Sequence, residues 1–319
     1  MSHQPHHPTN RWLGAVTVIL TLLGWSTVPL FLRELGERID PWTNNGWRYG
    51  FSAMLWLPWI VWVWKSGRLR KGIWTSALWP SVANIFGQMC FTAAFVELDP
   101  GLVTFCLRTQ LIFVAVMAWF MFPVERELMK TARYLVGVAM LIIGMAPVLL
   151  GGDVAWEGSN LLGIAYAMGS AVGYACYGIF VRKHMVHDHP ITAFSVIAQE
   201  TALGLLVLML VFGRDRGGYV PQLSSSDLWM LGVSAIIGIA IGHVFYYTSI
   251  ARLGVSVTSG VLQLQPFLVT IASERIFGET LTGMQWTGGV VAVIGAGVML
   301  SAKGKGPRHV ARAASETGD

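Results

Sequence analysis

The amino-acid sequence predicts an all-α integral membrane protein, with ten transmembrane helices arranged as two inverted repeats of five helices. The first observation is composition: of 319 residues, 54% are hydrophobic and 12% are charged, and the mean hydropathy is +0.57. A soluble domain has about 25% charged residues, so a soluble enzyme, a secreted disulfide scaffold and a disordered chain are excluded. The other two observations are a series of long apolar segments and an internal repeat.

The apolar segments have the length of membrane spans, which need about 20 mostly apolar residues. Ten segments qualify, at residues 12–32, 43–64, 73–96, 101–122, 132–150, 160–181, 191–212, 228–250, 255–277 and 281–301. These runs are too long for β-strands and lack the alternation over about 10 residues that a transmembrane barrel requires. We therefore expect a helical bundle in the lipid bilayer.

The basic residues predict the orientation of this bundle. Fifteen Lys and Arg residues lie in the loops and tails on one side and five on the other. Cytoplasmic loops carry an excess of Lys and Arg, so the tails at 1–11 and 302–319 are both expected to be cytoplasmic. The net charge of +5 forms no basic face interleaved with aromatic residues, and a nucleic-acid partner is not expected.

The internal repeat relates the two halves of the chain. Residues 24–33 match residues 173–182, and Gly87, Gln88 and Phe91 match Gly242, His243 and Tyr246. This second register places Arg108 and Gln110 opposite Gln263 and Gln265.

Because each half holds five spans, the halves 12–150 and 151–301 are expected to enter the membrane from opposite sides. This is the inverted repeat of many secondary transporters, in which the binding site lies near the membrane midplane between the halves.

Several motifs point to one family. They are Trp25-Ser26 in the first span, Arg48 early in the second, the Arg-Thr stretch at 107–113, Pro266-Phe267, and the glutamates Glu125 and Glu279. With these motifs the chain resembles the drug/metabolite transporter superfamily, in its ten-helix EamA-type branch, over roughly residues 12–301. The resemblance implies export of amino acids or related metabolites from a bacterial cell, across its inner membrane. One departure is that Leu111 stands where the second half has Pro266, so an equal helix break in the first half is not predicted.

Arg108 is the leading candidate for solute binding. An ionisable group at membrane depth is costly, and Arg108 lies about 10 Å inside its span at a rise of about 1.5 Å per residue. It shares one helical face with Thr104, and that face is expected to line a hydrated cavity. Arg108 could contact an anionic group of a solute or pair within the protein. Arg48 lies nearer its span end, so it is expected to extend to the headgroups as an anchor.

Glu200 and His243 are the other ionisable candidates. Glu200 lies in the middle of its span, where it could couple transport to protons or brace the packing of helices. His243 could titrate near neutral pH or act as a neutral hydrogen-bonding group.

Polar and aromatic residues recur every three to four positions in four of the spans. They are Asn84, Gln88 and Phe91; Thr104 and Arg108; Gly242, His243, Tyr246 and Tyr247; and Ser256, Ser259, Gly260, Gln263, Pro266, Phe267 and Thr270. A polar stripe on an apolar helix must face protein or water, so it serves either bonds between helices or a cavity. We expect a cavity in which Phe91, Tyr246 and Trp25 cover the apolar part of a solute.

These features predict a secondary transporter of small organic metabolites, with amino-acid-like, anionic or zwitterionic solutes, that works by alternating access. The sequence has no nucleotide-binding, hydrolase or metal-binding motif, so no catalytic residue, metal or cofactor is expected. The alternative is a membrane-embedded enzyme or lipid-handling protein that uses Glu200 and His243 as acid and base. A scaffold or receptor would leave the polar stripes without a purpose. The oligomeric state stays open, with a homodimer as one option.

Overall fold

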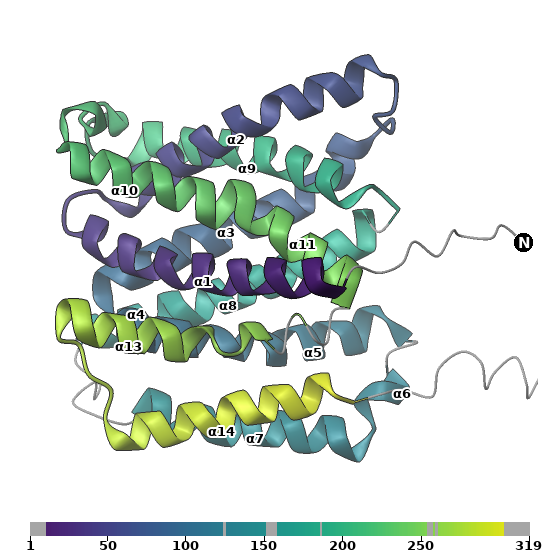
Figure 1. The fold of residues 1–319 in the computed structure, drawn as a ribbon, viewed down its shortest axis with the longest axis vertical. Helices are drawn as coiled ribbons and strands as arrows, with labels where there is room; N and C mark the ends of the chain where they lie inside the picture. Colours follow the sequence, from purple (N-terminus) through teal and green to yellow (C-terminus); the bar gives the residue numbers. More distant parts are fainter. Residues whose placement is uncertain are drawn as a thin grey trace, which may run out of the picture.

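The computed structural model describes residues 11–123, 126–150, 158–185, 187–253, 258 and 261–302. In this part of the chain every regular element is a helix (Figure 1), which confirms the all-α prediction. Nearly all of both predicted tails lies outside the described residues. So do the motif residue Glu125 and the stripe residues Ser256, Ser259 and Gly260.

The elements of the first half follow one another closely along the chain. They are α1 (Arg11–Gly36), α2 (Pro41–Lys65), α3 (Ile73–Glu97), α4 (Pro100–Cys106), the 3-10 turn η1 (Leu107–Thr109), α5 (Gln110–Met121), α6 (Arg126–Met129) and α7 (Ala132–Leu150).

The second half has two long helices and then several shorter elements. They are α8 (Gly158–Met185), α9 (Pro190–Phe212), the 3-10 turns η3 (Arg214–Gly217) and η4 (Val220–Gln222), α10 (Ser225–Ala235), the π-helix η5 (Ile236–Ile241), α11 (Gly242–Leu253), α13 (Gln265–Phe277) and α14 (Gly283–Leu300).

Seven described segments are long and apolar enough to cross a membrane. They are residues 12–36, 100–121, 132–150, 161–185, 191–212, 225–249 and 283–300. The predicted spans in α2 and α3 are helices of 25 residues each, but they are less apolar. In α2, six tryptophans and two asparagines lower the mean hydropathy. The chain is thus a multi-pass membrane protein, and the predicted count of ten stays a prediction.

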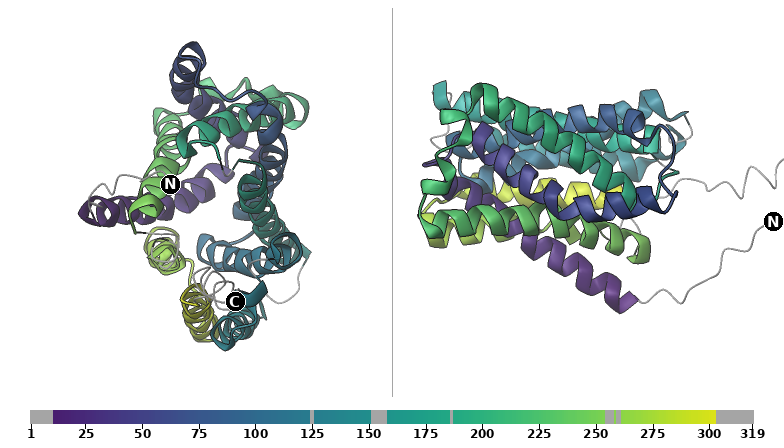
Figure 2. Two further views of the ribbon diagram at one scale, coloured as in Figure 1. Left: turned by 90° about the vertical axis from the view of Figure 1, so that its right-hand side faces the viewer. Right: turned by 90° about the horizontal axis from the view of Figure 1, so that it is seen from above.

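Helices of the first half pack mainly against helices of the second half. The extensive contacts pair α1 with α11, α2 with α9, α3 with α8, α4 with α13 and α7 with α14. The pair α2 and α9 lies at one end of the elongated bundle, and the pair α7 and α14 lies at the other (Figures 1 and 2). The contact between the two halves therefore runs along the length of the bundle.

Glycines allow the backbones of α7 and α14 to touch. A side chain on Gly137 would overlap the backbone of Met299, and one on Gly144 would overlap the backbone of Ala292. Since the later residue of α7 meets the earlier residue of α14, the two helices run antiparallel. Small residues of this kind are the usual device for close helix packing in membranes.

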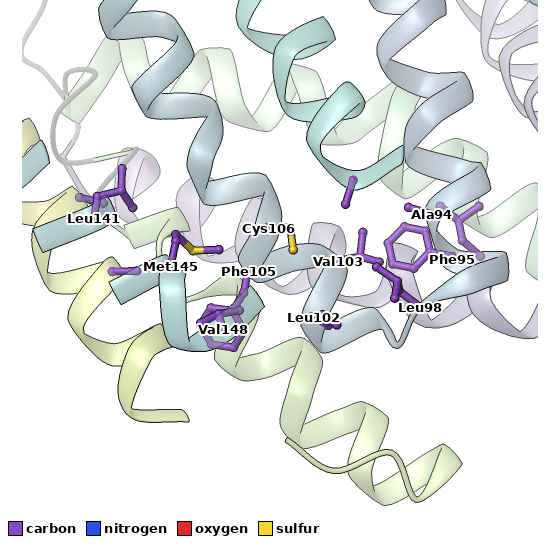
Figure 3. Packing of buried hydrophobic residues seen from close by; sticks show 14 of the residues in the cluster. Ala94, Phe95, Leu98, Leu102, Val103, Phe105, Cys106, Leu141, Met145 and Val148 are labelled. Atoms are coloured by element: carbon purple, nitrogen blue, oxygen red, sulfur yellow. The ribbon is translucent and has the colours of Figure 1, made fainter. Parts of the chain in front are cut away.

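The largest buried apolar cluster joins the ends of several helices. Phe95 of α3 and Leu98, the residue after α3, meet Val103 and Phe105 of α4, while Met145 of α7 packs beside them (Figure 3). Large apolar side chains on the outer faces stay exposed instead, as with Phe120 at 71%. Such surface is stable against lipid rather than water.

Candidate solute-binding site

Two interrupted helices define the candidate site, one in each half. In the first half, α4 ends at Cys106, the 3-10 turn η1 follows, and α5 begins at Gln110. In the second half, a turn at residues 263–264 precedes α13, which begins at Gln265. Gln110 and Gln265 are equivalent in the register that matches Gln88 with His243. Both halves are therefore interrupted at equivalent positions.

The two interruptions have different local causes. Pro266 has no backbone N–H and cannot continue a helix from the preceding turn, which explains the break before α13. The first half has Leu111 at this place, so an equal break there is not predicted. That expectation is wrong: the helix tightens to a 3-10 turn without proline, and Arg108 is one of the residues of this turn.

Arg108 connects the two interruptions. Its Nε donates to the carbonyl of Thr104 at 3.2 Å, its Nη1 to the carbonyl of Leu262 at 3.3 Å, and its Nη2 to Oε1 of Gln265 at 3.3 Å. Two of these acceptors lie at the break of the other half, and all of them are uncharged. One of these acceptors, the carbonyl of Leu262, would have residue 266 as its regular helical donor, and Pro266 has no N–H to donate.

Gln265 extends this network to α1. Its Nε2 donates to the carbonyl of Trp25 at 2.9 Å. The Trp25 ring lies 5.4 Å from the ring of His243 and 5.2 Å from that of Tyr246, centroid to centroid. Gln263, beside these groups in the turn, is buried. The structure thus brings five of the predicted residues into one region.

His243 is held by backbone and aromatic contacts. Its Nδ1 lies 3.0 Å from the carbonyl oxygen of Ile239, in the π-helix η5. Its ring stacks on Phe194 of α9, with centroids 4.5 Å apart and planes at 14°. π-Helical turns frequently mark functional sites, and this one places His243 between α1 and α9.

Three other predicted residues make contacts of a different kind. The hydroxyl of Thr104 donates to carbonyls of its own helix, so only its backbone meets Arg108. Phe91 packs edge-on against Phe95 and Tyr174. The backbone carbonyl of Gln88 accepts from Asn45 Nδ2 at 3.1 Å. Gln88 and Phe91 therefore lie along α3, where it faces α2 and α8.

Glu200 and His243 lie in different surroundings. Oε2 of Glu200 accepts from the hydroxyl of Ser81 on α3 at 2.8 Å, whereas His243 meets α9 through Phe194. Phe194 and Glu200 are six positions apart in α9, which places them on different faces of this helix at 3.6 residues per turn. No hydrogen bond joins Glu200 to His243 among the described residues.

A polar stripe on α2 lies outside the set of predicted site residues. Asn44, Arg48, Ser52 and Trp56 recur every four residues, and each has side-chain nitrogen or oxygen atoms that are buried without a hydrogen-bond partner in the described part of the chain. Arg48 is only 2% exposed, so it does not extend to the headgroups as predicted. The spacing of these four residues was the signal that could have revealed the stripe.

At one end of the bundle an ion pair joins α1 to the second half. Arg33 Nε lies 2.8 Å from Oε1 of Glu279, whose other oxygen accepts from Ser273. Asp99, in the loop before α4, lies near this pair. Burial and, to a smaller extent, the negative charge of Glu279 together raise the pKa of Asp99 to about 6, although the positive charge of Arg33 opposes the shift.

Within the described residues no cluster of three or more His, Cys, Asp or Glu side chains could hold a metal ion. The ionisable groups of the site act instead through hydrogen bonds and charge.

Comparison with known proteins identifies a family and relatives. A profile of the EamA-like transporter family matches residues 12–150 and 161–301. A protein of Salmonella typhimurium described as a probable amino-acid metabolite efflux pump is 24% identical over 71% of this chain and 76% of its own length. An uncharacterized transporter of Clostridium kluyveri is 23% identical over 92% of this chain and 94% of its own.

A solved crystal structure shares the fold. It superposes with a TM-score of 0.60 at 14% sequence identity, covering 89% of this chain and 95% of the other.

Proposed function

Because the chain belongs to the EamA-like transporter family, we propose that it is a secondary transporter that moves small organic metabolites by alternating access between its two halves. The solutes would be amino-acid-like, anionic or zwitterionic, and the direction would be export across a bacterial inner membrane, with both termini in the cytoplasm. The relatives described as amino-acid efflux pumps support this solute class. Proton exchange or a downhill gradient would supply the energy, and Glu200 is the candidate for proton coupling.

The observation that carries this proposal is the bridge between the two interrupted helices. Arg108 of the first half binds Leu262 and Gln265 at the break of the second. Discontinuous helices expose backbone groups at membrane depth, and transporters use such groups to bind their solutes. A guanidinium has five N–H donors, and Arg108 gives one hydrogen bond from each of its three nitrogens. Two hydrogens are thus left for a solute.

The contacts between the halves support an inverted repeat. The equivalent helices α7 and α14 lie antiparallel along their glycines, as a twofold axis in the membrane plane requires. The α1–α11 and α3–α8 pairs would exchange under the same axis. Rocking of one half against the other would then break and remake the bonds of Arg108.

The other predicted residues have roles in this scheme. Gln263 and His243 would supply polar contacts beside Arg108, and Trp25 and Tyr246 would cover the apolar part of the solute. Phe91 would do so from α3, and Thr104 and Gln88 would line the path.

Flux measurements in proteoliposomes test the proposal. The purified protein is expected to exchange radiolabelled L-amino acids across the membrane with saturable kinetics. Replacing both Arg108 and Gln263 by Ala should reduce this flux at least 10-fold, whereas Lys71→Ala, at an exposed loop position, should leave it unchanged. Equal flux in the double variant would remove Arg108 and Gln263 from the site.

A further inference from the structure

The α2 polar stripe, formed by Asn44, Arg48, Ser52 and Trp56, has no structural explanation in the fold described above. A helix of 3.6 residues per turn places residues four apart on nearly the same face, about 6 Å from one another. The polar side-chain atoms without a partner are Nδ2 and Oδ1 of Asn44, Nε and Nη1 of Arg48, Oγ of Ser52 and Nε1 of Trp56. Buried polar groups in proteins are nearly always hydrogen-bonded, so a run of four exceptions on one helix needs a reason.

Arg48 is the most unusual member of this stripe. It is one of the largest fully buried side chains, and its one hydrogen bond among the described residues is a long one of 3.4 Å from Nη2 to the carbonyl of Ser234. None of the ion pairs between described residues involves it. The ionisable groups that act on its charge are Tyr49 and Tyr174, and a phenol is uncharged at neutral pH. The guanidinium is therefore a buried positive charge without a countercharge.

The stripe is rich in hydrogen-bond donors. The arginine and indole nitrogens can only donate, and the serine hydroxyl and asparagine amide can donate as well as accept. A carboxylate only accepts, and a guanidinium binds it through two parallel N–H···O bonds. Nη2 of Arg48 has a second hydrogen besides the one that it donates to Ser234. That hydrogen lies parallel to an N–H of one of the unpartnered nitrogens, Nε or Nη1, so Arg48 can still offer a pair of N–H donors to the two oxygens of a carboxylate.

The stripe is continuous with the candidate solute site. Trp56 packs edge-on against Phe194 at 5.9 Å, and Phe194 stacks on His243. From the other side, Arg48 reaches the carbonyl of Ser234, just before the π-helix that holds His243. Arg48 therefore contacts the residue two positions before the π-helix η5, and His243 lies two positions after its end.

We propose that Arg48 and the α2 polar stripe form a second solute-binding position, which recognises the carboxylate group of the transported solute. The proposal rests on the proposed transport function and adds a chemical requirement to it. Arg108, which is bonded to both halves, holds the helix breaks together and contacts the solute there. Arg48 selects solutes with a carboxylate over otherwise identical neutral ones.

Equilibrium binding measured by thermal stabilisation of the protein in nanodiscs tests this proposal. The probes are the twenty standard L-amino acids and, for the one that stabilises the protein most, its primary carboxamide. The wild type is expected to bind the acid at least 10-fold more tightly than the carboxamide. The Arg48→Gln variant should bind acid and carboxamide equally, and Arg48→Lys should show an intermediate preference. Arg68→Gln removes the charge of an exposed arginine and should behave as the wild type.

Each other outcome overturns the proposal. If Arg48→Gln keeps the full preference for the acid, the carboxylate is recognised elsewhere, with Arg108 as the next candidate. If 100 mM sodium chloride, compared with sucrose of equal osmolarity, abolishes the difference between wild type and Arg48→Gln, the position belongs to an inorganic anion. If no amino acid, acetate, lactate or succinate stabilises the wild type, the stripe does not bind carboxylates.

The failure of this inference can be told apart from failure of the transport function. Flux that depends on Arg108 but is equal for acid and carboxamide would leave the transporter intact and remove the role of Arg48. If the carboxylate preference disappears in Arg48→Gln but the wild type shows no flux in proteoliposomes, Arg48 binds carboxylates and the transport function is wrong.

Discussion

Arg108 and Arg48 are both arginines inside the helical bundle, but only Arg108 has a hydrogen-bond partner at each of its three side-chain nitrogens. Arg108 binds three acceptors, two of which belong to the other half of the chain. Arg48 has one long bond, and two of its nitrogens lack a partner within the described residues. Each buried donor without a partner costs about 1–3 kcal/mol.

The difference shows two uses of a buried charge. Arg108 donates to the carbonyl of Leu262 and to the side chain of Gln265 in the other half, so this charge contributes to the contact between the halves. At Arg48 the protein accepts a cost without a visible structural gain. A residue that lowers stability in this way is a candidate for binding something outside the chain. If the hydrogen-bond partners, rather than the residue type, decide how an arginine affects stability, replacing these two arginines should change the unfolding temperature in different ways.

Replacement of Arg108 should have the largest effect. Arg108→Met removes three hydrogen bonds and leaves the carbonyl oxygen of Leu262 and Oε1 of Gln265 without the donor that they have in the wild type. Hydrogen bonds to a charged group contribute about 1.5–3 kcal/mol each, so we expect a clear fall in the thermal unfolding temperature in nanodiscs and loss of flux. Arg108→Lys, with a single ammonium group, should recover part of both. An unfolding temperature equal to the wild-type value would mean that these bonds contribute nothing to stability.

Replacement of Arg48 should change stability in the opposite direction. Arg48→Met has a similar length and removes a buried, unpaired charge, and apolar replacements of buried charges are often neutral or stabilising by about 1–4 kcal/mol. The unfolding temperature without solute should therefore be equal or higher, while the preference for the acid over its carboxamide is lost. A fall as large as that of Arg108→Met would show that Arg48 has a structural role, and it would remove the contrast between the two arginines.

A double-mutant cycle with Gln265 tests the role of partners directly. Gln265→Leu removes the side chain that accepts from Arg108 and donates to Trp25. In this background Arg108 has fewer partners, so Arg108→Met should cost less than it does in the wild type. Residues in one hydrogen-bond network couple by about 0.5–3 kcal/mol. Additive effects in chemical or thermal unfolding would show that the two side chains act independently.

The sequence predicted the parts of this structure that depend on composition and periodicity. The apolar segments predicted helices, and the structure has helices there. The register that matches Gln88 with His243 also relates Gln110 to Gln265, the residues at which α5 and α13 begin. These features follow from local residue patterns, which a single sequence contains.

The positions of polar side chains across the bundle could not be predicted in this way. The 3-10 turn at Leu107–Thr109 has no proline to announce it. Whether Arg108 meets Gln265, or Glu200 meets Ser81, depends on how helices far apart in the chain rotate against each other. The depth of Arg48 along its own helix predicts that its side chain reaches the headgroups. Its burial is decided instead by neighbouring helices such as α10.

Arg33, unlike Arg108 and Arg48, has a carboxylate partner, Glu279. Here we expect the smallest effect on stability, and it arises from the nearby Asp99. Asp99 lies near the Arg33–Glu279 pair, and burial together with Glu279 raises the pKa of Asp99 from 3.8 to about 6. The folded state therefore binds a proton at pH values where the unfolded state has released it. Stability from this group is present below about pH 4 and is lost as the pH rises through 6.

Asp99→Asn removes this titration. The wild-type unfolding temperature should fall between about pH 4 and 6 more steeply than that of the variant, and above pH 6 the variant should be more stable by about 1–3 °C. Thermal unfolding in nanodiscs from pH 4 to 8 measures both curves. Asp215→Asn, which changes an exposed acid of the 3-10 turn η3, is the matched control. Parallel curves for wild type and Asp99→Asn would mean that Asp99 does not exchange a proton on folding, and that the charge of Arg33 balances both carboxylates.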